Sequence, residues 1–238
     1  MQRRCPIRRP RIAPAARVLS AGVNAYQPYS HGEEIAHSLT AAIGVAAMLV
    51  GIPWLMLTAA LHGGLAHIVG AAAFGIGALM MFGTSTLYHS TKRPELKRLL
   101  RKLDHSAIYI LIAGTYTPFT IGVIRGSLGW TLFGVVWTLA VFGVVVKMSG
   151  GLRLPILSTL LYVVIGWIGV VAFKQLSADL SATQLAWVIA GGLCYTGGVP
   201  FYLWKRQKYS HTVWHLFVLG GVACHFAAVM SVVSASAG

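Results

Sequence analysis

Two histidines near the end of the chain have the spacing of a shared metal site. His211 and His215 are four residues apart, which on a helix places both imidazoles on one face with about 5–6 Å between their Cβ atoms. Three imidazole nitrogens, with a fourth position left to water, form the pattern of a catalytic zinc site. His89 is the third candidate ligand, provided that the fold brings it to the pair.

Asp104 and Ser85 could complete such a site as catalytic residues. A carboxylate that is not a ligand can orient and deprotonate a zinc-bound water. Ser85 precedes His89 by one helical turn, where its hydroxyl could bond a substrate carbonyl, bond its oxyanion, or hold the resting water. Each residue also has a plainer interpretation, because an Asp at a helix start is often an N-cap and an interfacial His is often an amphipathic anchor.

The elements that must position these residues are membrane helices. Hydrophobic residues make up 56% of the 238 residues and charged residues only 10%, with a mean hydropathy of +0.71, which excludes an ordinary soluble domain. Apolar stretches of about 20 residues, the length that a helix needs to cross a bilayer, cover residues 35–61, 65–89, 104–124, 128–148, 155–173, 184–204 and 211–234. We expect an all-α fold, a polytopic bundle of seven transmembrane helices in the cell membrane.

Positive charge gives this bundle its expected orientation. The net charge is +14, and Lys and Arg concentrate in the N-terminal residues and in alternate breaks, at 92–102, 147–153 and 205–208. By the positive-inside rule the N-terminus is cytoplasmic and the C-terminus is outside. The positive charge is therefore explained by the orientation of the chain in the membrane. We expect membrane lipids and no nucleic acid as partners. Residues 1–28 read as a basic disordered tail, followed by one membrane domain over 29–238.

With this topology the candidate residues meet at one face of the membrane. The second span ends at His89, the third begins at Asp104 and the seventh begins at His211, all on the cytoplasmic side. Ionisable groups at membrane depth are rare and usually face a protein interior, so this convergence predicts a metal site. Zinc is the favoured ion, although imidazole sites also take iron, nickel or copper.

No site role is expected for the other histidines. One group lies in or beside loops or has no partner at ligand spacing: His31, His37, His62, His67 and His105. His225 is ten residues past His215, about 15 Å along a helix axis. We expect it to make a buried hydrogen bond.

The break after the second span carries an amphipathic pattern. Pro94 can begin a helix, and leucines recur at i, i+3, i+4 and i+7 from Leu96 to Leu103, opposite a basic face. This pattern predicts a short helix on the cytoplasmic leaflet, with a solvated loop as the alternative.

Three segments are similar to the motifs of a known family. They are Ser-x-x-x-His at 85–89, the stretch 103–118 that contains Asp104, and His-x-x-x-His at 211–215. Residues 29 to the end resemble the hemolysin III family, the bacterial branch of the group that contains the progestin and adiponectin receptors, with alkaline ceramidases as more distant kin. The resemblance implies seven spans, a cytoplasmic N-terminus and a zinc ion near the cytoplasmic face. It assigns the family's Ser, Asp and His positions to this chain without a departure.

Three functions remain open at this point. The first is a zinc-dependent intramembrane amidase or esterase that hydrolyses a lipid, which follows from an open zinc position beside acyl chains. The second is a pore-forming or membrane-perturbing hemolysin that causes cytolysis, although a pore predicts polar residues across the whole bilayer. The third is a receptor-like regulator of membrane state in which the zinc is structural.

Overall fold

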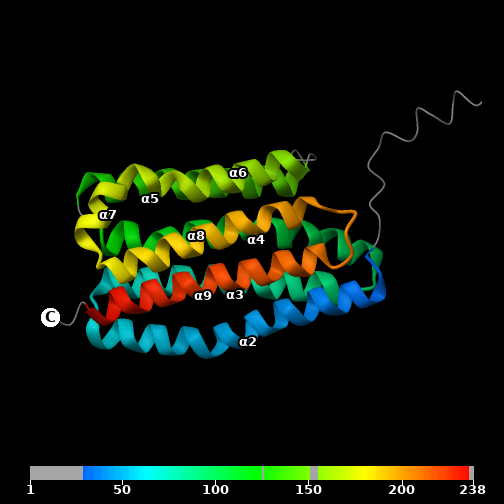
Figure 1. Ribbon diagram of the computed structural model, residues 1–238, viewed down its shortest axis with the longest axis horizontal. Coiled ribbons are helices and arrows are strands. Elements are labelled where there is room, and N and C mark those ends of the chain that lie inside the picture. Colours follow the sequence, from blue (N-terminus) through cyan, green and yellow to red (C-terminus); the bar gives the residue numbers. More distant parts are fainter. Residues whose placement is uncertain (1–28, 125, 151–154, 236–238) are drawn as a thin grey trace, which may run out of the picture. The chain divides into compact units, whose positions relative to one another are not determined.

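The computed structural model describes residues 29–124, 126–150 and 155–235, and all regular elements among them are helical. This confirms the all-α class. The predicted basic tail, residues 1–28, lies outside the described residues. Long helices run side by side along one common direction (Figure 1). In chain order the elements are α2 (His31–His62), α3 (Leu65–Ser90), α4 (Pro94–Gly122), α5 (Ser127–Ser149), α6 (Pro155–Trp167), the 3₁₀-helix η2 (Ile168–Ala172), α7 (Phe173–Asp179), α8 (Ala182–Leu203) and α9 (Ser210–Ala235).

The outer surface of the bundle suits a membrane. Six segments are long and apolar enough to cross one: α2, α3, α5, the run Ile156–Asp179, α8 and α9. Large apolar side chains point outward, and Leu65 and Val171 expose 78% and 74% of their surface. A contiguous apolar exterior of this kind is stable in lipid and not in water. The chain is a multi-pass membrane protein. Charged and hydroxyl side chains keep α4 out of the six, so the count of seven spans and the orientation stay predictions.

Helix α4 begins at Pro94 and not at residue 104. Residues 94–103 form its first turns, so the prediction of a separate helix on the leaflet was wrong. Nothing in the sequence breaks the helix between Leu103 and Asp104, and Pro94 suits a first turn because its missing N–H needs no partner there. Leu100 is buried with 8% exposure, so these turns pack on the bundle.

The fifth predicted span is longer than expected and is broken in its middle. α6 ends at Trp167, η2 follows, and α7 continues to Asp179. Tyr116 of α4 bonds both sides of the break, because its hydroxyl donates to the Gly166 carbonyl and accepts from the Gly169 N–H, each at 2.7 Å. Short 3₁₀ segments inside helices often mark a functional position.

Small residues bring α3 and α4 into close contact. A Cβ atom added at Gly114 of α4 would lie 2.5 Å from the backbone oxygen of Ala73. One added at Gly77 of α3 would lie 3.0 Å from the backbone oxygen of Ile110. Glycine permits such an approach between membrane helices. The middle of α3 is therefore held against the second half of α4. The starts of α2 and α9 lie at the same end of the bundle (Figure 1).

Candidate metal centre

The end of α3 and the start of α9 bring three histidines together. His89, His211 and His215 each offer a ring nitrogen, and these nitrogens lie within 4.8 Å of one another. The three residues are 3%, 9% and 4% exposed. The four-residue spacing on α9 places the His211 and His215 ring centroids 4.7 Å apart. Zinc–nitrogen bonds of about 2.0–2.1 Å can be reached from donors at these separations.

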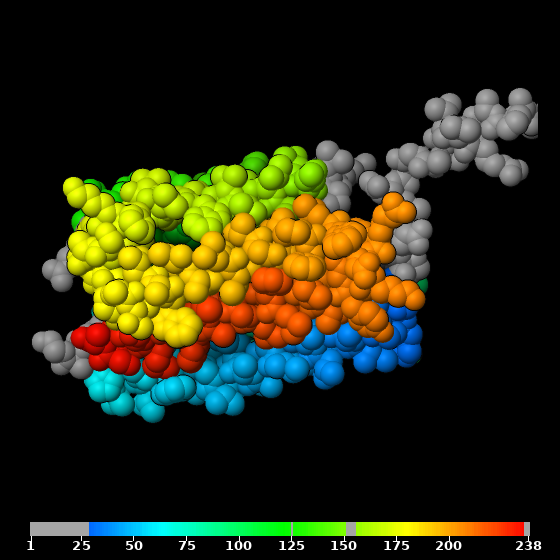
Figure 2. Space-filling model, in the orientation of Figure 1, coloured from blue at the N-terminus to red at the C-terminus, as the bar shows by residue number. Residues whose placement is uncertain are grey.

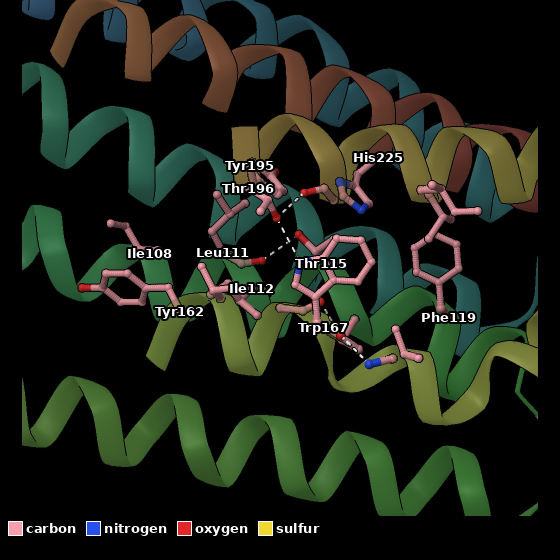
Figure 3. Close-up of a pocket in the computed structure, with 18 of the residues that line it drawn as sticks. Ile108, Leu111, Ile112, Thr115, Phe119, Tyr162, Trp167, Tyr195, Thr196 and His225 are labelled. Carbon is pink, nitrogen blue, oxygen red and sulfur yellow. Dashed lines mark hydrogen bonds between the residues drawn. The ribbon is translucent and has the colours of Figure 1, made fainter. Parts of the chain in front are cut away.

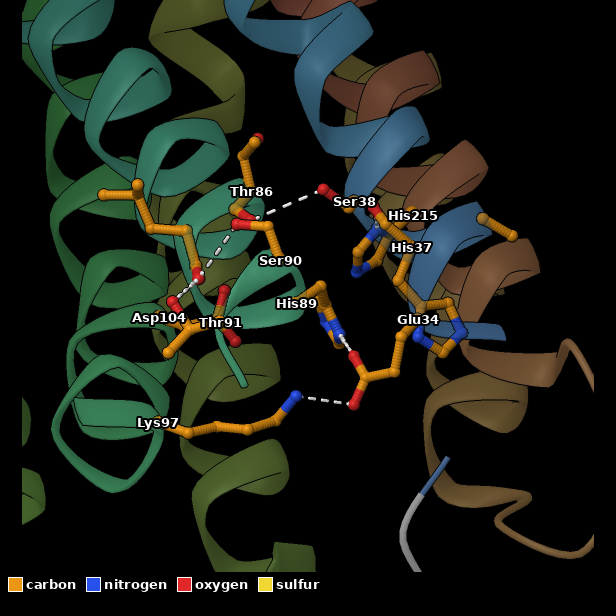
Figure 4. Close-up of polar contacts among 12 residues, drawn as sticks. Glu34, His37, Ser38, Thr86, His89, Ser90, Thr91, Lys97, Asp104 and His215 are labelled. Atoms are coloured by element: carbon orange, nitrogen blue, oxygen red, sulfur yellow. Dashed lines mark hydrogen bonds and ion pairs between the residues drawn. The ribbon is translucent and has the colours of Figure 1, made fainter. Parts of the chain in front are cut away.

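Glu34 of α2 orients the His89 ring. Its Oε2 lies 2.8 Å from His89 Nδ1, and its Oε1 accepts a hydrogen bond from Lys97 Nζ at 2.7 Å (Figure 4). An ionised carboxylate only accepts hydrogen bonds, so His89 Nδ1 is the donor. The proton on Nδ1 leaves Nε2 of His89 as the possible metal ligand, the arrangement that most metal-binding histidines show.

His215 is oriented in the same way by backbone and hydroxyl oxygens of α2. Its Nδ1 lies 3.1 Å from the carbonyl oxygen of His37 and 3.0 Å from Thr40 Oγ1. A carbonyl oxygen only accepts, which assigns the proton to Nδ1 and a lone pair to Nε2. Helix α2 therefore fixes two of the three rings, although it contributes none of them.

Asp104 and Ser85 are buried at the same end of the bundle. They are 7% and 1% exposed. Oδ2 of Asp104 lies 3.5 Å from Nδ1 of the next residue, His105. Because α4 begins at Pro94, Asp104 lies inside the helix, and the N-cap interpretation of this residue was wrong. Its carboxylate lies on the α3 side of the histidine cluster.

The sequence analysis missed two residues of this centre, Glu34 and His37. His37 is fully buried, and it forms with Glu34 and His89 a second group whose possible ligand atoms lie within 4.8 Å. It therefore has partners at ligand spacing, contrary to the expectation. The sequence did carry a signal, because Glu34 and His37 form a Glu-x-x-His pair on one face of the first helix.

The other histidines do not join these groups in the part of the chain that the structure describes. The hydrogen bond expected for His225 is confirmed, since its Nδ1 lies 2.9 Å from the carbonyl oxygen of Gly221. Its ring stacks on Tyr195, with centroids 5.5 Å apart.

An apolar cavity of about 200 Å³ lies beside the histidine cluster. Side chains of α4, α6, α8 and α9, among them Leu111, Trp167 and Tyr195, line it (Figure 3). The surface is hollowed between the α6–α7 run and α8 (Figure 2). Tyr202 also lines the cavity, and its ring centroid lies 5.9 Å from that of His211. His89, His211 and His215 do not line the cavity, so the contact between its wall and the cluster is made by Tyr202.

Comparison with known proteins places the chain in a family. Residues 29–226 match the family described as haemolysin-III related. The chain is 43% identical over 198 residues to a hemolysin-3 homolog of Bacillus subtilis (strain 168), covering 83% of this chain and 93% of the relative. It is 41% identical over 198 residues to hemolysin-3 of Bacillus cereus, covering 83% and 90%.

A more distant relative is the adiponectin receptor protein of Drosophila melanogaster, 26% identical over 189 residues that cover 65% of this chain and 40% of the receptor. No solved structure matches. The match across residues 29–226 and the identity to the two Bacillus proteins make this chain a member of the haemolysin III family.

Proposed function

We propose that this protein is a zinc-dependent hydrolase that cleaves an amide or ester bond of a lipid within the membrane. The observation that carries the proposal is the convergence of His89, His211 and His215, together with an apolar cavity lined in part by Tyr202, whose ring contacts His211. Three nitrogen donors suit a catalytic zinc site. The neighbouring carboxylate of Asp104 and the lipid-facing surroundings suit hydrolysis of an apolar substrate.

The donor atoms present fit a zinc ion. Nδ1 of His89 and Nδ1 of His215 are already bonded to oxygens, so Nε2 of each ring is available as a neutral donor of the kind that zinc prefers. When bound, zinc would supply a Lewis acid and lower the pKa of its water to about 7.

Asp104 and Ser85 would handle the proton and the substrate. Asp104 would take a proton from the attacking water as its oxygen adds to the carbonyl carbon, and return it to the leaving nitrogen or oxygen. The carbon–nitrogen or carbon–oxygen bond then breaks, giving a carboxylic acid and an amine or alcohol. Ser85 would donate its hydroxyl hydrogen to the carbonyl oxygen while negative charge develops there.

The cavity supports a lipid as the substrate. Its walls are almost entirely apolar and aromatic, and Tyr202 and Trp214 form the part nearest to His211. An acyl chain in the hollow between the α6–α7 run and α8 would lie against this apolar lining and could extend to Tyr202, which contacts His211. A pocket of this kind binds by burial of apolar area and orients by a few polar contacts.

The metal content of the detergent-purified protein tests the first step. We expect about one zinc ion per chain, as for a mononuclear site, and its loss when His211 and His215 are both changed to Ala. The matched control is His225→Ala, which removes a buried histidine from the same helix and should retain the metal. A folded protein without metal, prepared without chelators, would contradict the proposal.

Asp104→Asn separates hydrolysis from a structural role of the metal. The variant should keep its zinc and lose at least about 100-fold of the turnover of lipid amides or esters, because general acid–base catalysis contributes about 10²–10⁴-fold. Retained turnover would favour a receptor-like regulator with a structural ion. Because a relative is named hemolysin-3, ion flux through liposomes is the parallel measurement, and flux that is independent of Asp104 would favour a pore.

A further inference from the structure

His37 of α2 lies among the three candidate ligands. Its side chain is fully buried. Its ring centroid lies 4.7 Å from that of His89, 4.9 Å from that of His211 and 5.6 Å from that of His215. The ring thus lies close to all three of the others, and it comes from a different helix (Figure 4).

The position of His37 is fixed by the ligands themselves. Its carbonyl oxygen accepts the hydrogen bond from His215 Nδ1, and Thr40, one turn later, contacts the same nitrogen. On the other side, Glu34 precedes His37 by one turn and accepts from His89 Nδ1. The backbone of α2 is therefore tied to both α3 and α9 at the level of the His37 ring, which limits how far the ring can move from the cluster.

We propose that His37 is a fourth nitrogen ligand, so that this member of the family carries a four-histidine metal site. The inference rests on the metal site proposed above. It follows from the position of the ring among the other three and from the group of His37, Glu34 and His89, whose possible ligand atoms lie within 4.8 Å.

A fourth imidazole changes the chemistry of the centre. Four nitrogen donors complete a tetrahedral shell for zinc, and they also suit copper or nickel. The resting ion would then have no position open to water. Hydrolysis would then require either a fifth ligand position for water or the release of His37. Zinc does expand to five ligands in some catalytic sites.

Metal affinity and the spectrum of bound Co²⁺ test the proposal without reference to turnover. The unaltered protein, His37→Ala and His37→Gln are purified in detergent, and Zn²⁺ affinity is measured by competition with a chromophoric chelator. His37→Gln fills a similar volume without an imidazole, and both variants are checked for helical content and for elution as a single species. His225→Gln is the control for loss of a buried histidine outside the cluster.

We expect both His37 variants to bind Zn²⁺ more than about 100-fold more weakly, which exceeds the 10–100-fold loss typical of groups that only orient a ligand. The visible bands of Co²⁺ should change in both, because band position and intensity depend on ligand number and type. Added imidazole should restore the bands in His37→Ala, where it can fill the space left by the ring. His225→Gln should match the unaltered protein.

The results separate this proposal from the one on which it rests. If the unaltered protein binds zinc through His211 and His215, and the His37 variants keep its affinity and its Co²⁺ spectrum, the four-histidine site is wrong and the hydrolase proposal stands. If the unaltered protein binds no metal at all, both proposals fall.

Discussion

In two of the clustered histidines, a hydrogen bond to one ring nitrogen, Nδ1, holds the ring so that the other nitrogen can bind a metal. His89 Nδ1 is bonded to Glu34, and His215 Nδ1 to oxygens of α2. These bonds fix both the ring orientation and the tautomer, so that the remaining nitrogens are neutral donors pointing inward. The Glu34 carboxylate is in turn bonded to Lys97. Hydrogen bonds between charged groups therefore link the first turn of α4 to the histidine cluster.

Glu34→Gln should weaken metal binding without removing a proposed zinc ligand. Gln keeps the size of the side chain but loses the negative charge that accepts from His89 and Lys97. We expect Zn²⁺ affinity to fall by about 10–100-fold, the usual effect of losing a group that orients a ligand. Chelator competition measures it, and Glu33→Gln is the control, since Glu33 accepts a bond from the Tyr209 N–H outside the cluster. Equal affinities in the two variants would contradict this role for Glu34.

The sequence places some of these residues and not others for a physical reason. His211 and His215 share one helix, so their spacing alone puts them on one face. His89 follows from the number of spans, because four predicted crossings, an even number, separate it from His211 and so return the chain to the same side of the membrane. Glu34 and His37 depend on the rotation of α2 about its own axis relative to α3 and α9, which packing sets and hydropathy does not reveal.

At the scale of the elements, hydropathy shows which segments form helices. Packing between helices decides where a helix begins and where it is broken. Most predicted spans lie within a few residues of α2, α3, α5, α8 and α9. The start of α4 was misplaced because residues 94–103 were assigned to a separate helix on the leaflet, although Leu100 packs inward. The break between α6 and α7 was not predicted, since it depends on the hydroxyl of Tyr116 from another helix.

The contact between α3 and α4 can be tested at Gly114. Gly114→Ala should lower the free energy of unfolding by about 1–3 kcal/mol, the usual cost of overpacking, because the new Cβ would lie 2.5 Å from a backbone oxygen. Gly134→Ala on α5 is the control, since a Cβ there meets nothing within 4 Å, and it should be neutral or stabilising. Thermal unfolding in detergent measures both, and similar midpoints would argue against a tight α3–α4 contact.

The break in the fifth span can be tested at Tyr116. Tyr116→Phe removes the hydroxyl that bonds Gly166 and Gly169, and we expect a loss of about 1–3 kcal/mol from the groups left without this partner. Tyr195→Phe is a matched control on the opposite wall of the cavity, because the Tyr195 hydroxyl makes no hydrogen bond within the described residues. Thermal unfolding compares the two variants. A Tyr116→Phe protein as stable as Tyr195→Phe would show that the break needs no such bond.

At the scale of the whole bundle, the histidine cluster and most of the basic residues lie at one end. The ends of α3 and α8 and the starts of α2, α4 and α9 lie together (Figure 1), and this end carries the histidines. Basic residues flank it, at Lys92 and Arg93 and again from Lys205 to Lys208. The opposite end, around the start of α8, has few charges. This asymmetry supports a cytoplasmic position for the histidine end, since positive loops are retained inside.

Labelling of single cysteines in intact cells tests this orientation. A membrane-impermeant maleimide should label Thr183→Cys, at the exposed start of α8, and should not label Gln207→Cys, which lies between Arg206 and Lys208. After the membrane is permeabilised, both should react. The native cysteines are first replaced by Ser: Cys5, Cys194 and Cys224. Labelling of Gln207→Cys alone in intact cells would show that the orientation is the reverse of the predicted one. The histidine cluster would then lie at the outer face, open to metal ions and lipids of that side.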